Sequence, residues 1–504
     1  MILEVPTKEL TRRIQAVAVE TSVPYTQADA KAHREKHRED RDELGRLRDE
    51  FYDSLSARAD ALFELTDALL CAGEPVRTLV ELSLTGEHRR GHGALYDGLG
   101  CGRIDFDRLR RSLSTLTLPR DHDGRIVLAV DISAWLRPDA PTSPQRAFCH
   151  VYGRGKNAAQ LIPGWPYSFI AALEPGRSSW TAVLDAVRLH PDDNETAVTA
   201  IQIRDVVTRL QESGQWKEGD PDILLIFDSG YELARMAFML ADLPVVVLGR
   251  MRSDRVLWFP APPPGRTGRP PRHGAEFRFA EHQSWPTPAA TTNTGTDRYG
   301  TATAQAWNRL HPRITHSGSW AEHPGPPPIV EGTVIRLTVD HLPGDRNPTP
   351  VWLWFSDPDV GAGEVDRLWQ LYLRRFDLEH TFRLFKQTLG WTAPKIRSPE
   401  AADRWTWLVI VAHTQLRLAR PLAEDLRRPW EKPAPPRRLT PARVRRGFSR
   451  IRQAMPCPAS APKPTRPGPG RPTGSKNSRL APRYDVGKRR TTDNDGSKRR
   501  RRTG

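Results

Sequence analysis

Three acidic residues, far apart in the chain, are the best candidates for chemistry. Asp131 lies near the end of the apolar run IVLAVDI, and Asp228 directly follows the apolar run ILLIF. Carboxylates at the ends of strands in an open α/β sheet face the crevice where ligands usually bind. Glu379 lies in the polar segment YLRRFDLEHTFRLFK. Three carboxylates supply the hard oxygen ligands that Mg²⁺ prefers, so these residue types suit metal-dependent phosphodiester cleavage.

The segment around Glu379 predicts one long helix, Gly363–Leu389, with a polar stripe. Arg375, Glu379 and Lys386 are 3, 7 and 14 residues beyond Tyr372. At about 100° per residue, these side chains fall within an arc of roughly 60° on one helix face. Such a stripe suits a site for metals and phosphates better than it suits packing on a core. Arg375 and Lys386 would hold phosphate oxygens, and Tyr372 would donate a hydrogen bond to one.

Other carboxylates compete for these positions on weaker grounds. A lone Asp after a strand is more often a turn or cap residue than a catalytic one. Competitors near the first position lie in turn-like contexts, and those near the second precede their strand. Asp377 lies about 170° from the centre of the Tyr/Arg/Lys face on an ideal helix. The competing residues are Asp121, Asp123, Asp139, Asp220, Asp222, Asp357, Asp359, Glu364 and Asp377.

At these residues the sequence resembles the DDE transposases of bacterial insertion sequences, which have an RNase H-like catalytic core. More narrowly, it is similar to the group whose third acid lies in a Tyr-x2-Arg-x3-Glu-x6-Lys signature. Tyr372, Arg375, Glu379 and Lys386 match that spacing in full. The resemblance covers about residues 125–420, and four fixed residues at fixed spacing make it fairly specific.

The resemblance implies a transposase that cleaves the ends of its element and joins them to target DNA. It further implies that Asp131, Asp228 and Glu379 bind two Mg²⁺ ions, for which Mn²⁺ can substitute. The expected partners are double-stranded DNA, as terminal repeats and as target, and a second copy of the chain in a homodimer on that DNA. A non-catalytic DNA-binding protein derived from a transposase is the alternative. A metal-dependent nuclease that cuts without joining is a third possibility.

The elements that must position these residues predict an α/β fold with a mixed sheet. The resemblance makes this sheet RNase H-like, with flanking helices and a β-rich insertion, preceded by a helical N-terminal domain. Short apolar runs predict strands at Ile126–Ile132, Ala147–Tyr152, Ser168–Leu173, Ile223–Phe227, Val245–Leu248 and Val351–Phe355. Amphipathic spacing predicts helices at Trp180–Leu189, Thr196–Glu212, Tyr231–Leu240 and Asp403–Leu418.

Changes in composition divide the chain into five parts. Residues 1–120 are helical, 121–258 and 351–428 form the core, 259–350 are the β-rich insertion, and 429–504 are a disordered basic Pro-rich tail. The N-terminal part fits either a DNA end-binding domain of helix-turn-helix type or a plain helical cap on the core. Its first helix, Gln27–Leu55, has one sparse apolar stripe and is predicted to face solvent or a partner.

Basic residues in three segments are candidates for DNA contacts. The N-terminal helices carry Arg89, Arg90, His92, Arg103, Arg108, Arg110 and Arg111. In the insertion, a Pro/Gly loop holds Arg266 and the triplet Gly268-Arg269-Pro270, which would follow DNA beside the site. In the tail, Gly470-Arg471-Pro472 resembles an AT-hook, which inserts an arginine into a narrow minor groove. Attraction of DNA by a disordered tail without regard to sequence is the other interpretation.

Aromatic and histidine side chains of the insertion have simpler expectations. Trp285, Trp307 and Trp320 would either pack in the core or stack on a flipped base. Three histidines lack zinc-like spacing and are predicted at the surface, namely His311, His316 and His323.

Most of the positive charge of the chain lies in the tail. The 504 residues carry a net charge of +16, but residues 431–504 hold 22 Lys/Arg and only 4 Asp/Glu, which leaves −2 for the rest. A tail of this kind attracts polyanions, with nucleic acid as the first candidate. Four Cys without a CxxC pair argue against a disulfide framework or a Cys-based zinc site. No apolar run reaches the roughly 20 residues of a membrane span, so a cytoplasmic, nucleoid-associated bacterial protein is expected.

Overall fold

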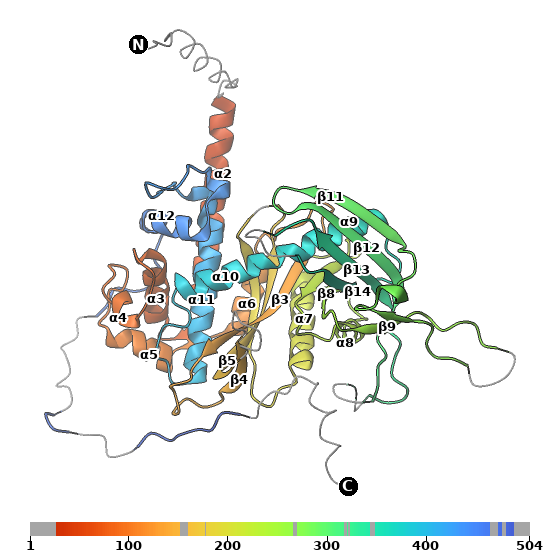
Figure 1. The fold of residues 1–504 in the computed structure, drawn as a ribbon. Helices are drawn as coiled ribbons and strands as arrows, with labels where there is room; N and C mark the ends of the chain where they lie inside the picture. Colours follow the sequence, from red (N-terminus) through yellow and green to blue (C-terminus); the bar gives the residue numbers. More distant parts are fainter. Residues whose placement is uncertain are drawn as a thin grey trace, which may run out of the picture.

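One mixed sheet of ten strands runs across the molecule (Figure 1). The computed structural model describes residues 27–151, 160–176, 178–265, 270–316, 320, 323–342, 348–463, 472–475 and 480–487. The strands of this sheet are β3 (Val127–Leu136), β4 (Ala147–Val151), β5 (Gln160–Leu173), β6 (Thr181–Arg188), β7 (Ile223–Phe227), β8 (Val245–Met251), β11 (Ala290–Thr296), β12 (Gly300–Leu310), β13 (Gly332–Val339) and β14 (Val351–Phe355). The mixed α/β fold is therefore confirmed.

The order of the strands places β3 in the interior of the sheet. β7 pairs with β3 in parallel, and β8 pairs with β7 in parallel. On its other side β3 pairs antiparallel with β5. The opposite edge of β5 pairs with β4 along its first residues and with β6 along its last residues. Beyond β8 the sheet continues through β14, β13, β12 and β11, all antiparallel. The strands β11 to β14 thus extend the same sheet. Two small antiparallel pairs stand apart from it, β9 (Val256–Trp258) with β10 (Glu276–Arg278) and β1 (Leu55–Ala57) with β2 (Arg103–Ile104).

Helices cover both faces of this sheet. One face packs on α7 (Glu195–Glu212) and α8 (Leu233–Met239). The opposite face packs on α9 (Ala362–Arg374), α10 (Phe376–Gln387) and α11 (Pro399–Ala419). Side chains alternate between the two faces of a strand. Ala129 of β3 and Ile226 of β7 belong to the face under α9–α11, so the residues two positions later, Asp131 and Asp228, point to that same face.

The helix α11 and segments from the N-terminal and C-terminal parts of the chain build a helical unit beside the sheet (Figure 1). Its other elements are α2 (Gln27–Asp53), β1 (Leu55–Ala57), α3 (Ala59–Cys71), α4 (Leu79–Leu82), α5 (Gly93–Cys101), β2 (Arg103–Ile104), α6 (Phe106–Thr115) and α12 (Pro441–Gln453). The apolar stripe of α2 is buried, with Leu44, Leu47 and Phe51 at most 1% exposed, because α2 packs on α3 and α11. The partner of this helix is therefore the chain itself. Among the described residues, no helix is long and apolar enough to cross a membrane.

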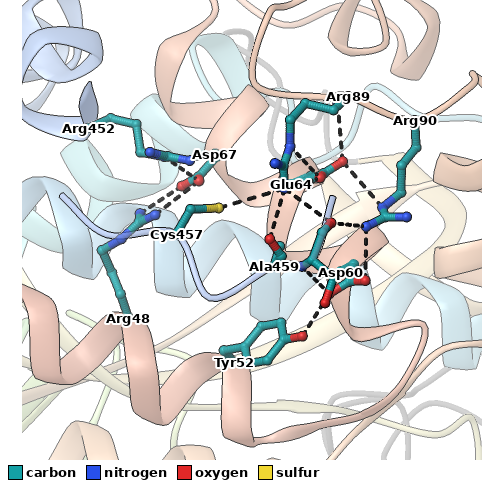
Figure 2. A network of polar contacts seen from close by, with 11 residues as sticks. Arg48, Tyr52, Asp60, Glu64, Asp67, Arg89, Arg90, Arg452, Cys457 and Ala459 are labelled. Atoms are coloured by element: carbon teal, nitrogen blue, oxygen red, sulfur yellow. Dashed lines mark hydrogen bonds and ion pairs between the residues drawn. The ribbon is translucent and has the colours of Figure 1, made fainter. Parts of the chain in front are cut away.

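A buried polar network joins the two chain ends (Figure 2). The Asp67 carboxylate of α3 accepts hydrogen bonds from Arg48 of α2 at 2.7 Å and from Arg452 of α12 at 2.6 Å. Arg48 also donates to Gln415 of α11 at 2.7 Å. A buried carboxylate needs such partners, since an unpaired charge in the interior is costly. The network therefore requires helices from both ends of the chain to be in place together.

The prediction of a disordered tail over 429–504 is wrong for its first part. Residues 441–453 form α12, preceded by a 3-10 turn at Pro436–Arg438. Val444 and Phe448 of α12 are fully buried against the helical unit. The composition suggested disorder because Pro and Arg are abundant. A few apolar residues spaced four apart are nevertheless enough to stabilise an amphipathic helix when it packs on an apolar surface of the same fold.

The predicted helix Trp180–Leu189 is a strand, β6. Its residues are buried on both faces, because α11 covers one side and α6 and α7 cover the other. Periodicity does not distinguish a short strand covered on both faces from a helix. The exposed surface that an amphipathic helix would keep is absent here. Asp185 of β6 is 3% exposed at its side chain and pairs with Arg110 and Arg209, each at 2.9 Å.

In the insertion, packing accounts for the tryptophans. Trp307 and Trp320 are buried, and each indole N–H donates a hydrogen bond, to Pro286 O at 2.8 Å and Glu232 Oε1 at 2.6 Å. Trp285 stacks on Phe277 and is partly buried. His311, predicted at the surface, is fully buried, which corrects that prediction. Its Nε2 lies 2.9 Å from His273 Nδ1, so a neighbouring histidine supplies its polar partner.

In a chain truncated after Thr440, the helical unit should unfold at a lower urea concentration than in a chain truncated after Lys463. The shorter chain lacks α12, so it loses the burial of Val444 and Phe448, about 1.5–3 kcal/mol each, and the Arg452 partner of Asp67. Urea unfolding followed by circular dichroism measures the difference. Equal midpoints for the two truncated chains would contradict the role given to α12.

Asp185→Ala should destabilise the fold strongly. The change leaves Arg110 and Arg209 facing a buried position without their shared carboxylate, and breaking a buried pair in this way costs about 3–5 kcal/mol. Asp107→Ala is the matched control, because Asp107 also pairs with Arg110 at 2.9 Å but is 77% exposed. That exposed pair contributes at most about 1 kcal/mol. Similar losses for both variants in chemical denaturation would count against a structural role of Asp185.

Candidate active site

The three predicted acids meet at one guanidinium. Arg375 lies 3.4 Å from Asp131 Oδ2, 3.7 Å from Asp228 Oδ2 and 3.0 Å from Glu379 Oε1. The arginine side chain is 5% exposed, while those of Asp131, Asp228 and Glu379 are 21%, 36% and 48% exposed. The acids therefore form the solvent-facing side of a site whose floor is the buried guanidinium.

The parallel pairing of β3 and β7 brings the two aspartates together. Val130 of β3 is in register with Phe227 of β7, so the next residues, Asp131 and Asp228, stand side by side. β7 ends at Phe227, whereas β3 continues to Leu136 against β5. The Asp131 side chain is fixed further by the Ile132 backbone N–H, which donates to Oδ1 at 2.8 Å.

The third acid comes from a helix that is broken at Arg375. The predicted helix Gly363–Leu389 is divided into α9 and α10. Around the break the Arg375 N–H donates to Tyr372 O at 3.1 Å and the Leu378 N–H donates to Arg375 O at 3.0 Å. These bonds span three residues instead of four, which marks a tighter turn. Glu379 lies in the first turn of α10, one turn beyond Arg375.

Two aromatic rings lie close to the Arg375 guanidinium. It lies 5.9 Å from the centre of the Tyr372 ring and 5.2 Å from that of Phe376. Tyr372 is 3% exposed, and burial raises the pKa of its hydroxyl to about 12, with a further contribution from the charge of Asp228. This burial favours Tyr372 as a support for Arg375 more than as a donor at the surface. Phe376, by contrast, is 46% exposed beside the acids.

Burial and charge act in opposite directions on the groups of this site. Burial raises the pKa of Asp131 to about 6, although the Arg375 charge and the Ile132 N–H act to lower it. Burial by itself lowers the pKa of Arg375, but the surrounding acids outweigh this effect and the net direction is upward. The guanidinium therefore stays charged, and it compensates part of the negative charge around it.

Lys386 lies at the other end of α10 and is exposed. Its Nζ is 5.7 Å from the centre of the Trp391 ring. The side chain reaches solvent, but protein atoms packed around its amine desolvate the ammonium and lower the pKa of Lys386, while the charge of Asp131 opposes that shift. Glu379 and Lys386 thus extend from the acid site along one helix towards solvent, which leaves the ammonium available for a charged ligand.

Several of the competing carboxylates are engaged elsewhere. Asp121 pairs with Arg367 of α9 at 2.6 Å. Asp139 pairs with Lys395 at 3.3 Å. Asp377 is 7% exposed and pairs with Arg374, on the side of the helix away from the acid site. Of the predicted DNA contacts, Arg266, Arg269 and Arg471 lie outside the described residues.

Several basic residues of the N-terminal helices already have partners within the fold. In Figure 2, Arg89 and Arg90 pair with Glu64 and Asp60 of α3 and donate to the carbonyls of Ala459 and Ser460. Arg108 and Arg110 also form ion pairs, whereas His92, Arg103 and Arg111 are exposed. These pairs favour a helical cap on the core over a domain that reads DNA through these arginines.

The donor set fits a divalent cation in its chemistry. Three carboxylates offer hard oxygen ligands, and the buried Oδ1 of Asp228 has no hydrogen-bond partner. In this structure the three acids surround the arginine, and among the described residues no three His, Cys, Asp or Glu side chains are placed to hold a metal together. Sequence reasoning found all four residues but assigned Arg375 to phosphate alone. Its spacing of four from Glu379 was the available signal for an ion pair.

The sequence has a recognisable family relationship. Residues 50–313, just over half of the chain, match the family model described as DDE superfamily endonuclease. The matched segment includes Asp131 and Asp228 and ends before Glu379. No curated protein shows significant similarity to the chain. Such a family implies a DNA substrate. Because the match extends over both aspartates and the central strands of the sheet, the chain belongs to the DDE superfamily endonucleases.

Proposed function

We propose that the protein is a DDE transposase of a bacterial insertion sequence, which cleaves the ends of its element and joins them to target DNA. The observation that carries the proposal is the convergence of Asp131, Asp228 and Glu379 on one guanidinium. These residues come from β3, the end of β7 and α10. A structural ion pair needs one acid, whereas three around a single arginine form an excess of negative charge that suits a cation site.

The strand order supports an RNase H-like core. In the segment β6-β5-β3-β7-β8, the strands β3, β7 and β8 run parallel, and β5 and β6 follow β3 as an antiparallel meander. We assign this segment, with α7, α10 and α11, to that core. The strands β11 to β14 are then an extension of it, inserted between β8 and α9.

Asp131, Asp228 and Glu379 would hold two Mg²⁺ ions, for which Mn²⁺ could substitute. When bound, such ions activate an attacking oxygen and stabilise the leaving oxygen of a phosphodiester. The chain itself contributes position. The register of β3 on β7 fixes the two aspartates, and the first turn of α10 brings Glu379 over them.

Two basic residues would bind the DNA backbone beside the acids. Lys386 is exposed at the end of α10 and offers an ammonium to a phosphate oxygen. Arg375 would bind a phosphate through two N–H groups once the three acids no longer pair with it. The basic Pro/Gly loop around Arg269 and the AT-hook-like Arg471 are proposed as further contacts, and a homodimer on paired ends as the active assembly.

Replacing each acid by its amide should abolish cleavage while DNA binding survives. Asp131→Asn, Asp228→Asn and Glu379→Gln keep the shape of the side chain but lose the charge that holds a cation, so cleavage should fall by at least about a thousandfold. The assay is excision in Mg²⁺ of a marker flanked by the native DNA on either side of the reading frame. Asp139→Asn, at an exposed carboxylate near β3, is the matched control and should stay active.

Cleavage by all three amide variants would refute the assignment of the site. Absence of excision by the unmodified protein, with the flanking DNA still protected, would favour a non-catalytic DNA-binding protein derived from a transposase. Joined products separate the remaining alternatives, since a transposase links the cut 3′ ends to a second DNA and a simple nuclease does not. Gel electrophoresis of labelled ends with a supercoiled target reports both.

A further inference from the structure

We propose that Arg375 is a resident counter-cation of the acid site, which holds the three carboxylates together in the metal-free protein and gives them up when divalent metal is taken up. This inference rests on the proposed function, because it assumes that the acids are metal ligands. It adds a second role for Arg375, which precedes the phosphate contact and controls access to the site.

The charges at the site make such a role necessary. Asp131, Asp228 and Glu379 all lie within 3.7 Å of the guanidinium of Arg375. Within the part of the chain that the structure describes, no other basic side chain forms an ion pair with any of the three. Three carboxylates gathered around one guanidinium repel one another in a partly buried setting. One positive charge compensates part of that repulsion, and without it the acids would have to separate or take up protons.

Asp131 presents to Arg375 the oxygen that a metal would use. Asp131 has Oδ1 bound to the Ile132 N–H, so Oδ2, which faces Arg375, is its oxygen left for a ligand. Asp228 also presents Oδ2 to the arginine, while its buried Oδ1 has no hydrogen-bond partner. A guanidinium and a divalent cation at the same oxygens repel each other, so occupation by one opposes occupation by the other.

The attachment of Arg375 is suited to release. Its guanidinium is held by the three acids and by the rings of Tyr372 and Phe376. The residue stands at the break between α9 and α10. Its neighbour Arg374, by contrast, pairs with Asp377 and donates to the carbonyls of Glu174 and Ser178. Arg374 is thus anchored in the fold, whereas Arg375 is held mainly by the site.

A direct test is the affinity of the purified full-length protein for Mn²⁺, measured by electron paramagnetic resonance without DNA. Arg375→Gln and Arg375→Met remove the charge, and Met keeps an unbranched stem against the two rings. Each should bind Mn²⁺ at least about tenfold more tightly than the unmodified protein, a difference of about 1.4 kcal/mol. Arg375→Lys keeps the charge and should bind like the unmodified protein, as should the control Arg374→Gln.

The thermal stability of the same proteins gives a second readout. Without metal, the neutral variants should unfold at a lower temperature than Arg375→Lys, because the three carboxylates lack their counter-cation. Saturating Mn²⁺ should remove most of that difference, since ligand binding to the folded state stabilises it. A neutral variant that folds only in the presence of Mn²⁺ would support the proposal for the same reason.

Two results would overturn the inference while the proposed function stands. One is Mn²⁺ affinity in Arg375→Gln and Arg375→Met equal to or weaker than that of the unmodified protein. The other is failure of these variants to fold even with Mn²⁺, which would make Arg375 a packing residue. Failure of the proposed function looks different, because then the unmodified protein would bind no Mn²⁺ at this site and Asp131→Asn would leave Mn²⁺ binding unchanged.

Discussion

The mutual repulsion of three carboxylates is the constraint on which the architecture of the site depends. Asp131, Asp228 and Glu379 are brought within reach of one another by the fold, and their charges oppose that approach. The positive charge of the buried Arg375 guanidinium compensates part of their negative charge. Its own burial is supported by the Tyr372 and Phe376 rings, which attract a cation through their faces. Both the packing of the rings and the charge of the acids therefore favour an arginine at this position.

Other parts of the fold keep that convergence in register. The parallel pairing of β3 with β7 fixes the two aspartates side by side. The helix α9 is tied to the segment before β3 by pairs of Arg125 with Glu364 and of Arg367 with Asp121, at 2.9 and 2.6 Å. Because α9 leads directly into α10, these ion pairs also help to set the position of Glu379. Polar contacts far from the acids thus contribute to their geometry.

The helical unit gives the two chain ends a common structural role. Asp67 of α3 is bound by Arg48 and Arg452, whose helices are some four hundred residues apart in the sequence. Arg89 and Arg90, which would be free to contact DNA in an isolated N-terminal domain, form ion pairs here with Glu64 and Asp60. The unit therefore packs onto the sheet through α6 and α11, and α12 lies against α3 and α11.

The local sequence was enough to predict a helix or strand wherever the pattern within that element was unambiguous. The strand IVLAVDI, the strand ILLIF and the helix over 196–212 were predictable because their apolar runs and periods are unambiguous. It failed for β6, which is covered on both faces, and for α12, whose apolar residues are few among arginines. In both cases the burial that decides the structure comes from segments distant in the chain, and single-segment patterns do not contain it.

By itself the sequence determined which residues form the candidate site. Their types, their places at strand ends and their spacing on a helix identified Asp131, Asp228, Glu379 and Arg375 without coordinates. Only the tertiary structure decided how they are arranged, with the arginine between the acids and Tyr372 buried beneath it. The physical reason is that an ion pair between distant segments depends on distances of a few ångströms, and strand register and helix packing set those distances.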